Sequence, residues 1–433
     1  MAKKKVELTP EEKLAQALVP KEEQPYEIPE GWKWVRLSGV YQINPKIDAP
    51  KEIDAAFIPM EKISAGMVSE FSFDVQTWEK AKKGHTQFAD NDVAFAKISP
   101  CFENRKSMIL QGLPNGIGGG TTELIILRSE FVIPKFTFWL VSDENFIRGG
   151  KQTYSGTVGQ QRISMDFVKN YPVPLPPLAD QQRIVERIES LFSKLDEAKE
   201  KTQAVVDGFE LRKSAILHKA FSGELTAKWR EEHGVGLESW EKKALKDILD
   251  VRDGTHDSPL YYDEGYALVT SKNLKNGTIT DDGIKYISRE DFIKINERSK
   301  VDIGDILFAM IGTIGNPVVV ENEPNYAIKN VALLKNVGKV NPYYVKYYLE
   351  SQYVKDKMKK EAKGSTQRFV PLGYLRKFEI VVTINDEQKE IVRILGSLLA
   401  KEARAKEAAE AVLEQVEVMK KAVLARAFRG ELC

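Results

Sequence analysis

Two short loops carry the side chains of this sequence that are best suited to binding another molecule. Residues 157–162 read Thr-Val-Gly-Gln-Gln-Arg, and residues 365–368 read Ser-Thr-Gln-Arg. Arginine and glutamine can form paired hydrogen bonds with the edges of guanine and adenine, while lysine chiefly neutralises phosphate. Both loops lie in basic stretches: residues 355–377 hold eight basic and two acidic residues, and residues 147–170 hold four and one. The net charges of plus six and plus three predict contacts with nucleic acid.

Alternatives remain open for parts of this pattern. The lysines of residues 355–363 also fit an ordinary solvated helix face. Residues 97–106 and residues 253–259 form two further loops that could present base-reading groups, but His256 also fits a capped turn in which Asp and Thr side chains bind local amides. The candidate DNA-binding residues are Lys97, Arg105, Lys106, Lys151, Thr157, Gln161, Arg162, Thr255, His256, Lys359, Lys360, Thr366, Gln367 and Arg368.

Motifs for catalysis are not found in the sequence. It has no Gly-x-x-x-x-Gly-Lys-Ser/Thr loop, and residues 116–121 lack the spacing of a dinucleotide-binding fingerprint. The four histidines have no second ligand at a zinc-site spacing. Residues 316–319, Asn-Pro-Val-Val, lack the second proline and the aromatic residue of an amino-methyltransferase loop. We therefore predict no catalytic residue, no metal site and no cofactor in this chain.

Composition and length fit a water-soluble protein of two or three domains. The chain has 433 residues, 42% hydrophobic and 29% charged, with a net charge of only +1. Any site for a polyanion must therefore be local. Its two cysteines, Cys101 and Cys433, cannot form a disulfide framework, and we expect a buried free thiol in a reducing compartment. No stretch has the roughly 20 apolar residues that a membrane span needs, so a cytoplasmic location is expected.

The sequence is a tandem duplication. Residues 92–98 recur as residues 305–311, the Gln161-Arg162 pair recurs as Gln367-Arg368, and Ala-Phe-Ser-Gly-Glu-Leu225 recurs 207 residues later as Ala-Phe-Arg-Gly-Glu-Leu432. Ordered matches at a nearly constant offset indicate two copies of one architectural unit.

Each copy combines short β-branched runs with one long heptad stretch. Positions spaced alternately four and three residues apart begin at Ile184 and recur, shifted by 207, from Ile391. This spacing predicts long helices that pair through a narrow seam. The seam residues are Ile184, Ile188, Leu191, Leu195, Arg212, Leu395, Leu398, Glu402, Val416 and Met419.

Two charged residues interrupt the seam and predict its register. A charge that faces apolar residues is costly unless it is paired. Placing Arg212 opposite Glu402 in an antiparallel pair, in which facing residue numbers add to 614, pairs both charges. The alternatives are a parallel pair, and side chains that reach the edge of the seam without touching.

These patterns predict an α+β fold, with two globular domains separated by a pair of long antiparallel helices in a pseudo-twofold repeat. The expected segments are residues 1–29, a mobile or peripheral helical tail; residues 30–177, the first domain; residues 178–225, the first long helix; residues 226–237, a linker; residues 238–383, the second domain; and residues 384–433, the second long helix.

The chain resembles the specificity subunit of type I restriction-modification systems. The resemblance rests on the Trp-containing start of each domain, the proline-rich residues 172–177, the sequence Asp-Gln-Gln-Arg-Ile-Val from Asp180, and the Ala-Phe-x-Gly-Glu-Leu helix ends. The second copy departs from this pattern, because Val-Val-Thr-Ile-Asn from Val381 replaces the proline-rich run, but it keeps Glu387-Gln388.

The resemblance implies a noncatalytic subunit whose two target-recognition domains each read half of an asymmetric bipartite sequence in double-stranded DNA. It further implies two adenine-N6 methyltransferase subunits that use S-adenosylmethionine, and restriction subunits that translocate DNA with ATP and Mg²⁺. Two other classes stay open: a stand-alone DNA-modifying enzyme, which would bind a cofactor itself, and a coiled-coil scaffold without DNA function.

Overall fold

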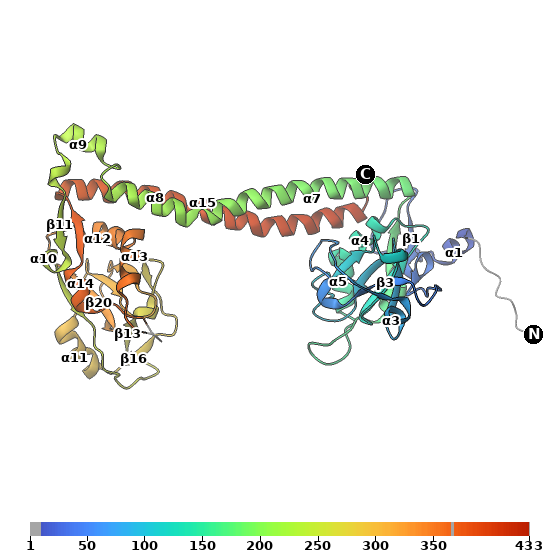
Figure 1. Cartoon of the computed structure of the whole chain (residues 1–433), viewed down its shortest axis with the longest axis horizontal. Coiled ribbons are helices and arrows are strands. Elements are labelled where there is room, and N and C mark those ends of the chain that lie inside the picture. The colour runs from blue at the N-terminus through green and yellow to red at the C-terminus, as the bar shows by residue number, and fades with distance from the viewer. Residues whose placement is uncertain (1–9, 365–367, 433) are drawn as a thin grey trace, which may run out of the picture. The chain divides into compact units, whose positions relative to one another are not determined.

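The computed structural model describes residues 10–364 and 368–432 (Figure 1). The chain forms two compact units. The first runs to Thr202 and includes the chain from Ala411 onward, and the second is Gln203–Glu410. Within the described residues, no helix is both long enough and apolar enough to cross a membrane.

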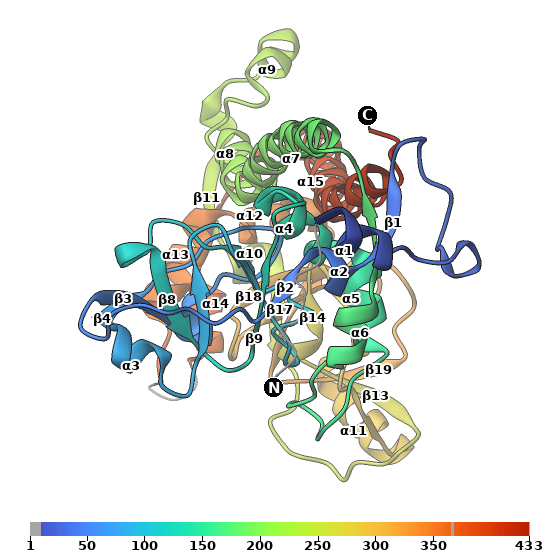
Figure 2. The ribbon, with the colours of Figure 1, turned by 90° about the vertical axis from the view of Figure 1, so that its right-hand side faces the viewer.

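The first unit is built on two four-stranded sheets and a two-stranded ribbon (Figure 2). Its strands are β1 (Lys33–Arg36), β2 (Gln42–Ile43), β3 (Asp54–Ile58), β4 (Asp74–Thr77), β5 (Thr86–Ala89), β6 (Val93–Ala96), β7 (Ser107–Ile109), β8 (Ile117–Gly120), β9 (Leu124–Arg128) and β10 (Pro172–Leu175). The sheet orders are β2-β9-β6-β7, β4-β3-β8-β5 and β1-β10. Strands β3 and β8 are parallel. All four residues of β6 are buried.

The helices of this unit pack on the sheets, all but α3 around one large core and α3 against a smaller cluster. They are α1 (Pro10–Gln16), α2 (Leu37–Val40), α3 (Trp78–Lys82), α4 (Pro134–Ser142), α5 (Glu144–Lys151), α6 (Met165–Asn170), most of α7 (Leu178–Asp207) and the end of α15 (Asn385–Phe428). Pro134 starts α4, where a missing amide hydrogen costs nothing, and the Asp143 side chain caps α5. Phe136 and Ile184 share this core with Leu424 and Phe428, so the end of α15 is part of the hydrophobic core of the first unit.

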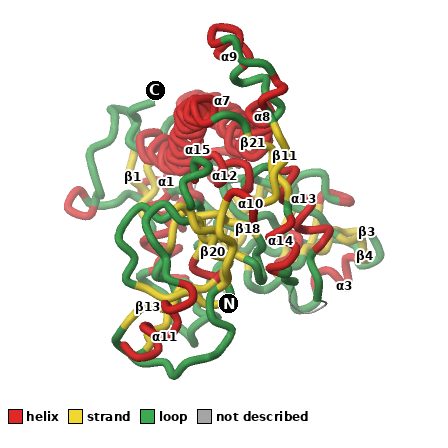
Figure 3. Tube along the Cα trace, turned by 90° about the vertical axis from the view of Figure 1, so that its left-hand side faces the viewer, coloured by secondary structure: helices red, strands yellow, loops and turns green. Residues whose placement is uncertain are grey.

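The second unit (Figure 3) has one four-stranded sheet, one three-stranded sheet, the two-stranded sheet β14-β15 and a two-stranded ribbon. Its strands are β11 (Glu241–Ala244), β12 (Leu249–Asp253), β13 (Tyr266–Thr270), β14 (Leu274–Lys275), β15 (Thr278–Ile279), β16 (Lys285–Ile287), β17 (Ile306–Ala309), β18 (Gly315–Val319), β19 (Tyr326–Lys329), β20 (Val331–Asn336) and β21 (Glu379–Val382). Its helices, besides part of α15, are α8 (Phe209–Phe221), α9 (Ala227–His233), α10 (Leu245–Ile248), α11 (Arg289–Ser299), α12 (Pro342–Leu349), α13 (Gln352–Glu361) and α14 (Leu372–Lys377).

Matching sheet topologies confirm the tandem duplication. The order β12-β20-β17-β18 repeats β2-β9-β6-β7, and the ribbon β11-β21 repeats β1-β10. The parallel pair β13-β19 likewise corresponds to β3-β8. The recurring sequences at residues 92–98 and 305–311 contain the equivalent strands β6 and β17.

A buried glutamine at the start of each long helix explains the repeated Asp/Glu-Gln motif. Gln181 accepts the amide of Ile133 at 3.0 Å and donates to the carbonyls of Phe131 and Pro176. Gln388 accepts the amide of Asn341 at 2.8 Å in the same way. Both side chains are almost fully buried. Each glutamine therefore ties its long helix to the helix α4 or α12 of its own domain.

The repeated tryptophan belongs to the same junction. Trp32 Nε1 donates to Asp180 Oδ2 at 3.2 Å, and Trp240 Nε1 donates to Glu387 Oε2 at 2.8 Å. Each carboxylate also pairs with an arginine, and the second pair is buried: Glu387 accepts from Arg230 Nη1 at 2.7 Å, whereas Asp180 pairs with the exposed Arg183. A charge-assisted bond of this kind is stronger than a neutral one.

The long helices pair antiparallel within each unit. In the first unit, Lys199 lies opposite Glu417 at 2.8 Å and Asp196 lies opposite Lys420 at 2.5 Å. In the second unit, Arg212 lies opposite Glu402 at 2.7 Å, and Phe209, one turn earlier, lies under Lys406. Residue numbers rise along one helix as they fall along the other, so the parallel alternative is wrong in both units.

The predicted heptad seam is correct only in part. Ile184, Ile188, Leu395 and Val416 are buried, but Leu191, Leu195 and Leu398 are only partly buried and Met419 is 48% exposed. The buried positions near the first domain are 181, 184, 185, 188 and 192 on α7, and 416, 420, 424, 427 and 428 on α15. These spacings follow the 3.6-residue period of a straight helix, because packing on a globular domain does not require a 3.5-residue repeat.

Two segments differ from those expected. The first long helix divides at Gly208 and ends at Phe221, before Gly223 with a φ of 86°. The expected linker at residues 226–237 holds α9, and its Arg230 is buried. The described part of the N-terminal tail packs on the first unit, where Val19 pairs with Trp34 through a 2.9 Å backbone hydrogen bond. Cys101 is a free thiol but only partly buried, and Cys433 lies outside the described residues.

Candidate nucleic-acid interface

In the first unit, the chain brings two of the predicted loops together. Residues 97–99 pair with residues 161–163: Ser99 N donates to Gln161 O at 2.8 Å, and Ile163 N donates to Lys97 O at 3.0 Å. The loop between Ser155 and Arg162 is closed by a further bridge between these two residues. Its tip is open to solvent, with Thr157 exposed and Val158 95% exposed. This geometry presents residues 156–160 to an incoming ligand.

Arg162, whose side chain is 43% exposed, holds this loop through contacts within the protein. Its guanidinium forms two hydrogen bonds with the carboxylate of Glu123, at 2.7 and 2.9 Å, and a third with Gln160 O at 3.1 Å. These bonds to Arg162, which outweigh burial, lower the pKa of Glu123. The edge of the guanidinium that would read a base is therefore occupied, and Arg162 acts in this structure as a positioning residue.

Two other predicted contacts are also bound internally. Arg105 donates from Nε to Ser142 O at 2.9 Å and forms an ion pair with Glu144, and its side chain is only 13% exposed. Lys106 Nζ donates to Met60 O at 2.9 Å. Both residues anchor the loop that follows β6, whereas Lys151 is exposed at the end of α5. For Lys151 the predicted phosphate contact stays a prediction.

The second unit repeats the two-loop arrangement one residue out of step with the sequence motif. Gly312 N donates to Arg368 O at 3.0 Å, as Ser99 N does to Gln161 O. Phe369 pairs with Ile311 as Arg162 pairs with Ile98. By backbone position, Arg368 thus corresponds to Gln161 and Phe369 to Arg162. The alignment of Gln161-Arg162 with Gln367-Arg368 was wrong by one residue, because a two-residue motif cannot show which side of the strand each residue occupies.

The second unit also lacks the carboxylate that binds Arg162. Glu123 precedes Leu124, which pairs with Ala96, and the equivalent residue before Val331 is Asn330. Arg368 is exposed and has no hydrogen bond or ion pair from its side chain within the described part of the chain. Thr366 and Gln367 lie outside the described residues. Sequence reasoning missed Glu123, because its partner stands 39 positions away.

Asn330 instead belongs to a network around His256. The imidazole lies 2.8 Å from Asn330 Oδ1 through Nδ1 and 2.9 Å from Asp253 Oδ2 through Nε2. Asp253 is nearly buried and also pairs with Arg298 at 2.5 Å. The hydrogen bonds to Asn330 and Asp253 raise the pKa of His256. The turn at His256 is thus held by Asp253 of β12 and by Asn330, which lies between β19 and β20. The capped-turn alternative, which named only local amides, therefore also needs these side-chain contacts.

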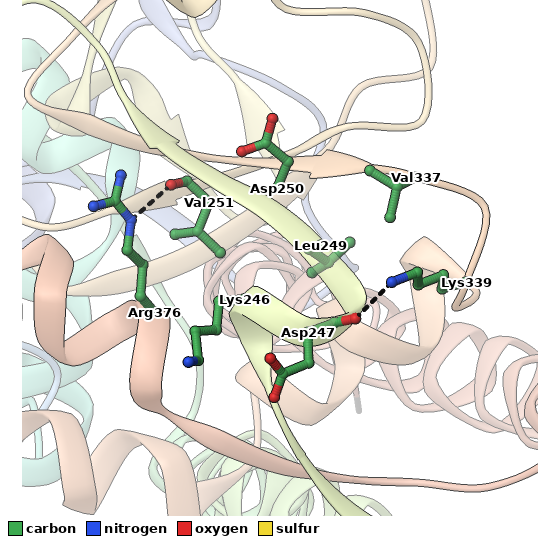
Figure 4. A pocket seen from close by; sticks show the side chains of 8 residues that line it. All are labelled: Lys246, Asp247, Leu249, Asp250, Val251, Val337, Lys339 and Arg376. Carbon is green, nitrogen blue, oxygen red and sulfur yellow. Dashed lines mark hydrogen bonds between the residues drawn. The ribbon is translucent and has the colours of Figure 1, made fainter.

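A shallow pocket on the second unit offers little to a ligand (Figure 4). Its volume is about 450 Å³, and it is lined by Lys246, Asp247, Leu249, Asp250, Val251, Val337, Lys339 and Arg376. Arg376 Nε already donates to Val251 O and Lys339 Nζ to Asp247 O, both at 3.0 Å. Two of the three cations are therefore used within the protein. No group of three metal-binding side chains occurs within residues 10–364 and 368–432.

Comparison with known proteins identifies the repeated unit. Residues 29–206 and 237–415 both match the family described as the type I restriction modification DNA specificity domain. The chain belongs to this family. Its two matches coincide with the two copies of the structural repeat, and both extend from the globular domains into the long helices.

Relatives of known name agree with this assignment. The EcoAI specificity subunit of Escherichia coli is 40% identical over 195 residues, which cover 44% of this chain and 33% of that protein. The MjaVIII specificity subunit of Methanocaldococcus jannaschii is 21% identical over 435 residues and 94% of each chain. The match to the EcoAI protein thus spans about a third of that relative's length.

Solved structures show the same fold. The HsdS subunit from Thermoanaerobacter tengcongensis matches 94% of this chain with a TM-score of 0.69 at 20% identity. A chain from a study of complex assembly and conformational transition in the type I R-M system matches 94% of this chain with a TM-score of 0.73 at 21% identity. These likenesses extend the shared fold over nearly the whole chain.

Proposed function

We propose that this chain is the subunit of a type I restriction-modification complex that binds double-stranded DNA and selects its sequence. Each target-recognition domain reads one half of a bipartite asymmetric target. The observation that carries the proposal is the repeated pairing of an Arg- or Gln-bearing loop with the loop after β6 or β17, in a chain composed of two DNA specificity domains. Loops on a rigid scaffold are common sites of recognition.

The proposal gives the chemistry of methylation and cleavage to other subunits. The chain directs two adenine-N6 methyltransferase subunits, which use S-adenosylmethionine, and ATP-dependent restriction subunits, which require Mg²⁺, to the selected DNA in the cytoplasm. Its own contribution is noncatalytic: it binds DNA and positions the partners. The low net charge of +1 is compatible with this role, because partner subunits would add surface that neutralises phosphate.

Sequencing of modified bases tests the proposal directly. Cells that produce this chain with its methyltransferase partner should methylate adenine in both strands of one bipartite motif. Cells that produce the methyltransferase alone are the control and should show no such motif. Absence of a motif with both proteins present would contradict the proposal. Binding of S-adenosylmethionine by the pure chain would instead favour a stand-alone modifying enzyme.

A further inference from the structure

A large cleft lies within the second unit and borders the paired loops that contain Gly312 and Arg368. Its volume is about 1010 Å³. One wall is formed by α12, α13, the loop before β18 and Arg368, and the other by α8 and α15. All of its lining residues fall between Phe209 and Glu410, so the cleft belongs to one compact unit.

The domain wall of the cleft is basic. It carries Lys346, Lys355, Lys359 and Arg368, with Glu350 as its carboxylate. Glu350 is already bound by two lysines, Lys346 at 3.2 Å and Lys213 at 2.8 Å. Within the described residues, the side chains of Lys355, Lys359 and Arg368 have no ion pair. The wall therefore holds three exposed cations that are free to bind an anion.

The helix wall is weakly acidic. It contributes three carboxylates, Glu210, Glu407 and Glu410, against two lysines, Lys406 and Lys213, together with Phe209. Lys406 lies 3.7 Å from Glu410 and over the ring of Phe209. A polyanion that entered the cleft would be repelled by the carboxylates of α8 and α15 and attracted to α13. The charge distribution thus orients such a ligand toward the domain wall.

Only one face of α13 takes part. Lys355 and Lys359 are four residues apart and line the cleft, as does Met358 between them. Lys357 and Lys360 are also exposed on this helix but do not line the cleft, and Lys357 lies over the ring of Tyr353. This arrangement separates two lysines that the sequence alone treated together, since Lys359 and Lys360 were both predicted to bind phosphate.

The loop beside these lysines allows close approach. Gly312 and Gly315 have φ values of 76° and 115°, which favour glycine, and a Cβ atom at either position would meet no heavy atom within 4 Å. Space beside the backbone is therefore open next to Arg368.

We propose that this cleft seats the sugar-phosphate backbone of the DNA bound by the second domain, with Lys355 and Lys359 as its phosphate contacts. The inference rests on the proposed DNA-binding function and adds the path of the backbone to it. The phosphates lie along α13, and Arg368 stands beside them at the edge of the duplex. Lys360 has no part in this contact.

The salt dependence of DNA binding tests the cleft. The complex of the full chain with its methyltransferase partner is titrated with a fluorescent random-sequence duplex over a range of salt concentrations. Each lost phosphate contact lowers the slope of log Kobs against log salt by about 0.9. The Lys355→Ala/Lys359→Ala variant should therefore lose about 2 from the slope. The matched Lys357→Ala/Lys360→Ala variant removes the same charge from the same helix and should keep the wild-type slope.

Three results would overturn the inference. Equal losses in both variants would show that α13 acts through its total charge, and no loss in either would place the backbone elsewhere. Intact DNA binding with loss of the partner subunit from the cleft variant would make the cleft a protein-binding site. Failure of the wild-type complex to bind any duplex would instead contradict the proposed function. Equal thermal midpoints of the variants and the wild type exclude misfolding, since alanine favours helix.

Discussion

Arg212 Nε and Glu402 Oε2 lie 2.7 Å apart, which joins α8 to α15 within the second unit. Arg212 also donates to Val205 O at 2.9 Å. The contact confirms the register predicted from the two charges that interrupt the seam, and it contradicts the alternative in which both side chains reach solvent separately. A shift of one heptad would place Arg212 against Leu395, which is fully buried in an apolar core.

Breaking this pair from one side should cost more than removing it. Glu402→Ala leaves the Arg212 guanidinium without its carboxylate, and we expect a loss of roughly 1 kcal/mol in the free energy of unfolding, because both side chains are partly exposed. Arg212→Met with Glu402→Leu should be the more stable protein. Urea denaturation measures both. The register argument fails if the double variant proves less stable than Glu402→Ala.

The buried pair of Arg230 and Glu387 should have a much larger effect. The side chains are 9% and 0% exposed. Glu387→Ala leaves a buried guanidinium uncompensated and should destabilise the second unit by about 3 to 5 kcal/mol. The control is Glu390→Ala on the same helix, which breaks an ion pair with the exposed Arg393 and should cost about 0.5 kcal/mol or less. If the two variants lose similar free energies of unfolding, the structure around Glu387 must relax and let Arg230 reach solvent, and the junction is not rigid.

His256 should titrate above the ordinary range for histidine. Because its hydrogen bonds to Asn330 and Asp253 raise its pKa in the folded state, the stabilisation it provides is complete below the unfolded pKa and is lost as pH rises through the folded value. The difference in thermal midpoint between the wild type and His256→Gln should therefore shrink with increasing pH. NMR titration of the ring Cε1 proton gives the pKa directly, and Asp253→Asn should lower it. An unchanged pKa in that variant would contradict the network.

Arg162 and Glu123 should give the same phenotype when either is changed. If Arg162 positions the loop at residues 155–162, then Arg162→Ala and Glu123→Gln should both increase amide hydrogen exchange in that loop and weaken recognition of the half-site read by the first domain. If Arg162 reads a base itself, Glu123→Gln should leave recognition nearly intact. Exchange rates and the methylated motif distinguish the two roles.

Arg368 should affect the other half-site alone. Its side chain is exposed and unpaired within the described residues, so Arg368→Ala should leave the fold unchanged. Loss of a base contact costs about 1 to 3 kcal/mol of binding free energy. Competition between duplexes altered in one half-site at a time measures this cost. A change in the half-site read by the first domain would show that the division of labour between the domains is wrong.

Repeat, fold class and helix register could be derived from the sequence alone. The duplication is visible because the two copies keep matching residues at a nearly constant offset. The antiparallel register at Arg212 and Glu402 follows because only two charges interrupt an otherwise apolar stripe, and each needs a partner. The buried positions of the helices near the first domain were predicted less well. There the helices pack against the globular core as well as against each other, so Met419, a predicted seam residue, is exposed.

Only the tertiary structure shows whether each candidate DNA-binding side chain is free or already bound within the protein. Arg105 and Arg162 are held by Glu144 and Glu123, each 39 positions away in the chain, whereas Arg368 has no described partner. Lys359 lines a cleft and its neighbour Lys360 does not. The sequence shows which side chains have the charge and hydrogen-bonding groups to bind an anion. Whether a cation is already neutralised depends on contacts between strands and helices that are distant in sequence, and these exist only after folding.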